Sequence, residues 1–202
     1  MPSPLNDRDS FEDAVFTGLD LAGADLSERI FERCTFRKLV LQESIWTKAR
    51  LHDCVFESCD LTRIKTTKLA LRGVEFLGCR LMGVDWSDVA PNPAVSFEDS
   101  NLQFASFVKV NLTKTRFRRC KLVDVNFIES RLAEADFGHS DLSGSRFERC
   151  DLRKADFADA RGVHFDPAKN TVKGAKISLA TAVLLASAAG LRVSGFDDDA
   201  AK

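Results

Sequence analysis

The chain has 202 residues, a formal net charge of −1 and hydrophobic residues at 45% of its positions, which suits a single folded domain. This balance is not the strongly basic one that favours direct binding to nucleic acid, and no run reaches the roughly 18 apolar residues of a membrane-spanning helix. Residues 1–7 hold two prolines and no apolar run, so we expect no secretory signal, no membrane contact and a cytoplasmic location.

A repeat of five residues begins after a short N-terminal extension, residues 1–8. From Phe11 to Trp86 every fifth residue is apolar, with the single exception of Thr66. From Phe97 to Phe157 every fifth residue is Leu or Phe. A period of five is neither the 3.6 of a helix nor the 2 of a flat strand, so it indicates a repeat architecture.

Each repeat has the same internal pattern around its large central residue. The residue two places before the centre is mostly small, and the residue directly before it is often Asp or Asn, as in Ala24-Asp25-Leu26. One large and one small residue in five can then point inward, which predicts a chain that turns a corner every five residues. Centres twenty residues apart tend to match, and this predicts four repeats per coil. The matching series include Phe16, Phe36, Phe56 and Phe76, then Leu21, Leu41, Leu61 and Leu81.

The same pattern bears on the polar centre and on the cysteines. Thr66 lies between Trp46 and Trp86 in its series, so we expect it to compensate for their volume in a close-packed interior. All six cysteines lie two residues before a centre, and none forms a CxxC pair. We therefore expect reduced, buried cysteines without a metal or other cofactor.

The register breaks once, between Trp86 and Phe97, which are eleven residues apart rather than ten. Two prolines lie in this segment, where they cannot serve a regular strand ladder. The segment is either a one-residue bulge or a protruding loop that joins two stacks, residues 9–86 and 97–165. As a loop it would offer partner contacts. The candidates are Trp86, Ser87, Asp88, Val89, Pro91, Asn92, Pro93 and Ser96.

A different pattern follows the repeat, in residues 166–194. Ser178 can cap a helix over residues 179–189, and Gly190 can end it. Its uncharged apolar surface could close the end of the rod, pair with a second copy across a two-fold axis, or do both. The candidate dimer residues are Leu179, Val183, Leu184, Leu185, Ala188 and Leu191. Residues 195–202 are expected to form a tail.

The repeat resembles that of the pentapeptide-repeat proteins, over residues 9–165. This resemblance implies an all-β solenoid, a right-handed quadrilateral β-helix, followed here by a short C-terminal α-helix. Length, two stacks with one irregular junction, and the helix ending in Gly-Leu-Arg-Val are most similar to the topoisomerase-protecting Qnr-type and albicidin-resistance proteins. That resemblance implies a homodimer through the helix, and a DNA-like rod that binds DNA gyrase or topoisomerase IV and relieves its poisoning by drugs.

Mimicry of DNA would require acidic residues that follow the phosphates. The candidate contact surface combines acidic residues of the second stack with two apolar ones: Asp85, Glu98, Asp99, Asp124, Glu134, Asp136 and Asp141, with Phe104 and Ile128. Catalysis has little support, because the chain has no Tyr and its three His share no motif. The alternative function is a general protein-interaction scaffold with an unrelated partner.

Overall fold

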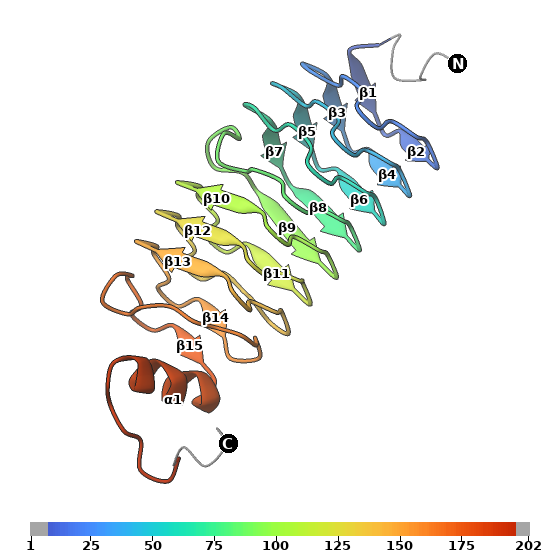
Figure 1. The fold of residues 1–202 in the computed structure, drawn as a ribbon. Coiled ribbons are helices and arrows are strands. Elements are labelled where there is room, and N and C mark those ends of the chain that lie inside the picture. Colours follow the sequence, from blue (N-terminus) through green and yellow to red (C-terminus); the bar gives the residue numbers. More distant parts are fainter. Residues whose placement is uncertain (1–7, 197–202) are drawn as a thin grey trace.

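The protein is a rod of stacked β-coils that ends in one helix. A computed structural model describes residues 8–196, and the coils run from the N-terminal end to the C-terminal helix in a single column (Figure 1). The described residues form 15 short strands and one helix. The expected all-β solenoid with a short C-terminal helix is confirmed. Most of the predicted N-terminal extension and tail, residues 1–7 and 197–202, lies outside the described residues.

The strands form parallel ladders that run along the rod, and we number the four faces of the coil in chain order. The first face carries β1 (Ser10–Glu12), β3 (Ile30–Glu32), β5 (Arg50–His52) and β7 (Ala70–Arg72). The second carries β2 (Val15–Thr17), β4 (Thr35–Arg37), β6 (Val55–Glu57), β8 (Val74–Leu77), β9 (Val95–Glu98) and β11 (Arg116–Arg118), and farther along β14 (Asp156–Phe157) and β15 (Lys176–Ile177). Strands β10 (Ser106–Val108), β12 (Asn126–Ile128) and β13 (Arg146–Glu148) lie on the fourth face. The third face is held by isolated bridges such as Asp60↔Arg80.

Residues twenty apart lie directly above one another, as the matching series predict. Phe16 pairs with Phe36 and Phe36 with Phe56, and their rings stack at centroid distances of 5.2 and 4.4 Å. Leu41 and Leu61 continue the third face and are buried. The core is thus a continuous column of centres, with coils at the usual strand spacing of about 4.8 Å.

Two local features make the corners. The residue two places after nearly every centre has a positive φ, as at Arg33 (49°) and Glu134 (59°). Most of these residues are not glycine, so the sequence carries no glycine signature for the corners. The Asp or Asn before a centre accepts a hydrogen bond from the backbone N–H two residues later, for example Asp60 from Thr62 at 3.1 Å. This bond explains the frequent Asp and Asn: they close corners.

The small inward positions are filled as the pattern predicts. All six cysteines are free and buried. Burial raises the pKa of the Cys54 thiol to about 11 and that of Cys120 to about 12, because the thiolate loses its hydration.

Thr66 is a buried centre of the fourth face, and its hydroxyl donates to the backbone carbonyl of Asp85. The neighbouring inward positions, small in most repeats, hold Ile64 and Leu69, and both are buried. The volume missing at Thr66 is therefore supplied from its own coil as well as by the tryptophans of the adjacent coils.

The coils continue farther than the repeat pattern suggests. Thr171 forms a bridge to Asp151, and β15 pairs with β14, so the ladder extends beyond residue 165 to Ile177. Helix α1 (Leu179–Ala188) follows directly. Its N-cap is Ser178, which accepts from the N–H of Thr181, and Gly190 follows the helix at φ 79°. Both predicted helix boundaries match the structure within one residue.

Candidate interaction surfaces

The junction loop, residues 87–96, lies where the first face would continue. Val74 pairs with Val95 and Phe76 with Phe97, which is a spacing of twenty-one residues instead of twenty. Phe97 thus lies over Phe76, as expected for a small excursion. Pro91 occupies the position of the missing centre, yet it is exposed. The core is filled from the sides instead, by the partly buried Val89 and Val95.

The prolines prevent the regular ladder at this point. A regular coil donates to the next coil from its centre and from the residue two places later, as Leu81 donates to Asn101 at 2.7 Å and Gly83 to Gln103 at 2.9 Å. Pro91 and Pro93 take the corresponding places and have no N–H to donate. A side-chain bond of 2.8 Å, from Asn111 to Asn92, joins the loop to the coil above.

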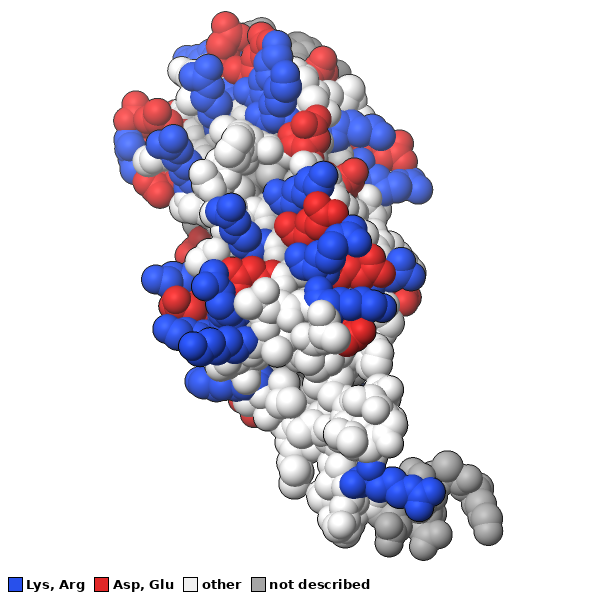
Figure 2. All heavy atoms as spheres, turned by 90° about the vertical axis from the view of Figure 1, so that its left-hand side faces the viewer, with Lys and Arg blue, Asp and Glu red and all other residues white. Residues whose placement is uncertain are grey.

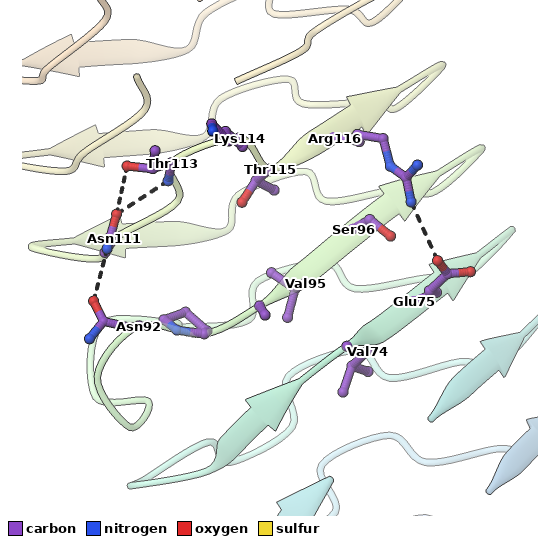
Figure 3. Close-up of a pocket in the computed structure, with 13 residues that line it drawn as sticks. Val74, Glu75, Asn92, Val95, Ser96, Asn111, Thr113, Lys114, Thr115 and Arg116 are labelled. Atoms are coloured by element: carbon purple, nitrogen blue, oxygen red, sulfur yellow. Dashed lines mark hydrogen bonds and ion pairs between the residues drawn. The ribbon is translucent and has the colours of Figure 1, made fainter. Parts of the chain in front are cut away.

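The loop is flanked by two hollows. One, of about 520 Å³, lies toward the second face, and its lining includes Asn92, Ser96 and Thr115 (Figure 3). Across its far side Arg116 reaches Glu75 at 3.4 Å, past the short side chain of Ser96 in the coil between them. The other hollow, of about 390 Å³, lies toward the fourth face and includes Lys109 and Arg131. The junction loop is therefore a ridge between the two hollows.

One predicted contact residue of this loop is a core residue. The Trp86 ring is 2% exposed and lies 5.9 Å from the Phe107 ring, nearly parallel to it. Because Trp86 is a buried centre of the fourth face, its side chain cannot contact a partner. Of the other candidates, Asp88, Pro91 and Asn92 are exposed, and Ser87, Val89, Pro93 and Ser96 are half-buried.

The acidic candidates do not form one strip. By register, Asp85 lies on the fourth face, Asp141 on the third, and Asp136 on the second. Asp85 and Asp136 also close corners, through bonds to the N–H groups of Ser87 and Gly138. These three acids lie on different faces because the residue before each centre serves every face in turn.

Most of these acids are also paired with a base from a neighbouring coil. Arg119 contacts both Glu98 and Asp99, at 2.8 Å in the case of Asp99. The hydrogen bond from Arg119 holds the pKa of Asp99 below its ordinary value. Similar pairs are Arg118–Asp136 at 2.6 Å, Arg161–Asp141 at 2.8 Å and Lys114–Glu134 at 3.8 Å. Figure 2 shows the outcome, with basic and acidic side chains interleaved over the body of the rod.

Asp85, Asp124 and Phe104 differ from this arrangement. Within residues 8–196, neither Asp85 nor Asp124 forms an ion pair. Phe104 is exposed, and Val108 and Ile128 lie one above the other in β10 and β12, each half-buried.

Helix α1 presents two different sides. Thr181 is buried and Leu185 packs against the core, so this side closes the column. Leu179, Leu184 and Leu191 are exposed to 66%, 60% and 63%. Val183 is half-buried and Ala188 is exposed. The end of the rod carries almost no charge (Figure 2).

The described part of the chain offers neither a metal site nor a membrane-spanning helix. Residues 8–196 contain no group of three or more His, Cys, Asp or Glu side chains that could hold a metal ion. Within the same range, no helix is both long and apolar enough to cross a bilayer.

The chain is similar to quinolone-resistance proteins. QnrB96, a quinolone resistance pentapeptide repeat protein of Scandinavium goeteborgense, is 28% identical over 113 residues, which cover 51% of this chain and 53% of that protein. The pentapeptide repeat protein QnrB4 of Escherichia coli is 29% identical over 113 residues, with the same shares. The chain thus spans about half the length of the curated relatives it matches.

Solved structures of similar shape include two pentapeptide-repeat proteins. QnrB1, a plasmid-mediated fluoroquinolone resistance protein, is 24% identical, with 92% of each chain covered and a TM-score of 0.37. HetL of the cyanobacterium Nostoc sp., which is involved in heterocyst differentiation regulation, is 20% identical, with 84% of this chain and 85% of that chain covered and a TM-score of 0.46.

A family model described as a pentapeptide repeat region matches residues 9–88 and 93–157. The unmatched residues between the two segments lie in the junction loop, where the structure leaves the regular ladder. The matched residues make up most of the chain and coincide with the stacked coils. The chain therefore belongs to the pentapeptide-repeat family.

Proposed function

We propose that this protein is a non-catalytic cytoplasmic rod that binds DNA gyrase or topoisomerase IV and protects it from poisons. The observation that carries the proposal is the similarity to QnrB96, a protein named for quinolone resistance. The filled column supports a binding role, because a core occupied by stacked side chains offers no deep cleft for a reaction. Protection would then act on the enzyme, while the drug stays chemically unchanged.

Two copies would form the active rod through helix α1. Leu179 and Leu184 of the helix, and Leu191 just beyond its end, are apolar and exposed, while Thr181 is buried and Leu185 packs against the column. A two-fold contact between such surfaces buries the same leucines on both copies. The rod would double in length and keep both of its junction loops available.

The junction loop would contact the partner, because the surface there departs from that of the regular coils. It forms a ridge between two hollows, and the side-chain hydrogen bond from Asn111 to Asn92 joins it to the next coil. Mimicry of DNA would rest on the shape of the rod and on a few free carboxylates. The interleaved ion pairs leave little uniform negative charge.

The paired surface favours a second candidate function, a protein-interaction scaffold with an unrelated partner. A partner that normally binds DNA would select for unpaired acids, and most acids of the second stack are paired. In that case the protein would have no effect on type II topoisomerases.

A supercoiling assay with purified gyrase, together with a decatenation assay with purified topoisomerase IV, separates the two functions. With a quinolone present, the proposal expects that added protein restores activity in proportion to its concentration, and that the drug is recovered intact. The variant Asn92→Gly removes the acceptor of the bond from Asn111, suits the positive φ of position 92 (57°) and leaves the corner bond of Asn111 in place, so it should lose protection while its unfolding midpoint stays near that of the parent. If a large excess of folded dimer neither inhibits nor protects either enzyme, the scaffold function replaces this one.

A further inference from the structure

Phe104 stands in a conformation that its side chain disfavours. It occupies the corner between the third and fourth faces at φ 62°. Among the non-glycine residues of positive φ within residues 8–196, it is the only apolar one. A left-handed backbone is unfavourable for a residue with a Cβ, and notably so for a bulky side chain.

Within residues 8–196, no aromatic stacking and no place in the buried core offsets this cost. The ring is 56% exposed and belongs to none of the aromatic stacks that hold the column together, such as Phe97 on Phe117. The backbone N–H of Phe104 donates to Val123 at 3.2 Å, a long bond for this ladder. A strained residue that does not stabilise its own fold is a candidate for function.

The surroundings of the ring suit insertion into another protein. One coil toward the N-terminus the same corner is Gly83, so the ring stands clear on that side. One coil toward the C-terminus it is Asp124, and on the adjoining fourth face the half-buried pair Val108 and Ile128 lies beyond Ser106 and Asn126. The ring therefore projects from a corner that has no side chain in the coil on one side and a carboxylate in the coil on the other.

The charges beside the ring define the partner. Asp124 and Asp85 flank this surface and have no ion pair within the described range, whereas Asp99, Asp136 and Asp141 are neutralised by arginines. A partner side chain that is basic could pair with them without displacing an internal partner.

We propose that Phe104 anchors the partner enzyme by inserting into an apolar pocket whose rim carries Lys or Arg side chains that pair with Asp85 and Asp124. Buried aromatic anchors with a charged rim are the usual form of an interface hot spot. This inference rests on the proposed function, because it takes the partner to be gyrase or topoisomerase IV.

The test uses the full chain with Phe104→Gly. Glycine removes the ring and relieves the corner, so the urea midpoint should be equal to or higher than that of the parent. Affinity for the topoisomerase should fall at least tenfold. The matched control is His139→Gly, at an exposed corner of φ 59° between other faces, which should leave affinity unchanged. Asp124→Asn should reduce the dependence of affinity on salt.

The outcomes separate this inference from the proposed function. If the parent binds neither enzyme, the proposed function fails and the anchor fails with it. If the parent binds and Phe104→Gly binds equally well, only the anchor is overturned. A Phe104→Gly protein that becomes monomeric by light scattering would also overturn it, because the ring would then serve contact between copies. Weaker binding by a variant that stays dimeric and stable supports the anchor.

Discussion

At the scale of single residues, an inward side chain must fit the volume of the column, and a polar atom that it buries also needs a hydrogen-bond partner. The indole Nε1 of Trp46 donates to the Ser44 hydroxyl at 2.9 Å. Ser44 occupies the small inward position two residues before Trp46. Trp86 has Val84 at the equivalent place, and its Nε1 is buried without a partner within residues 8–196. The Trp46 indole N–H thus has a hydrogen-bond partner, whereas the Trp86 ring is held by packing alone.

Removing the Ser44 hydroxyl should therefore be costly. Ser44→Ala leaves the Trp46 Nε1 unsatisfied and should lower the free energy of unfolding by about 1–3 kcal/mol. In a Trp46→Phe background the same change should cost less, because the donor is gone. Urea denaturation of the four proteins measures the difference. An equal cost in both backgrounds would show that the indole bond contributes nothing.

The six thiols should be inert in the native protein. Each is buried at an inward position, and burial raises the pKa of Cys54 and Cys120 far above neutral pH, so little thiolate is present. We expect slow labelling by a thiol reagent at pH 8 before denaturation, and six reactive thiols after it. Rapid labelling of Cys120 in the native state would contradict its place in the core.

At the scale of elements, helix α1 divides its work between two sides. Leu185 packs against the core, while its neighbour Leu184 is exposed. Adjacent residues therefore report on the two roles of the helix separately. In the view of Figure 2 the lower end of the rod is mostly white, with basic atoms near its tip.

Aspartate substitution should separate closure of the column from pairing of the copies. Leu184→Asp should give a monomer with an unchanged unfolding midpoint, because it charges only the exposed side. Leu185→Asp should lower the midpoint, because it places a charge against the core. Light scattering and urea denaturation distinguish the two. A parent protein that is monomeric at micromolar concentration would rule out the dimer.

At the scale of the whole molecule, ion pairs join coil to coil along the outside of the rod. Arg33 binds Asp13, Arg63 binds Glu43 and Arg149 binds Glu129, each across one coil. These pairs are exposed, so each should contribute little and should weaken with salt. Their combined effect is to neutralise the surface and to fix the register of neighbouring coils.

Acid should weaken the rod through the carboxylates of these pairs. Hydrogen bonds from arginine lower the pKa of Asp13 and Asp99 in the folded state. Their contribution is therefore full above the unfolded value, about 3.9, and is lost as the pH falls through the lower folded values. We expect a constant urea midpoint from pH 5 to 7 and a decline below about pH 4. A midpoint that stays constant down to pH 3 would show that these pairs do not stabilise the fold.

The sequence by itself determined the coil, the matching faces, the inward cysteines, the position of the break and the ends of the helix. These follow from a period of five, because a chain that turns every five residues must bury the same two positions in each turn. Tertiary structure decided which outer residues meet. The carboxylates before the centres can close a corner or bind a base one coil away, and only the stacked coils show that Asp60, Asp136, Asp141 and Asp156 do both. Three other features were also decided by tertiary structure: the exposure of Pro91, the continuation of the ladder to Ile177 and the isolation of Phe104. Each depends on contacts with residues about twenty positions away, which the local sequence pattern does not specify.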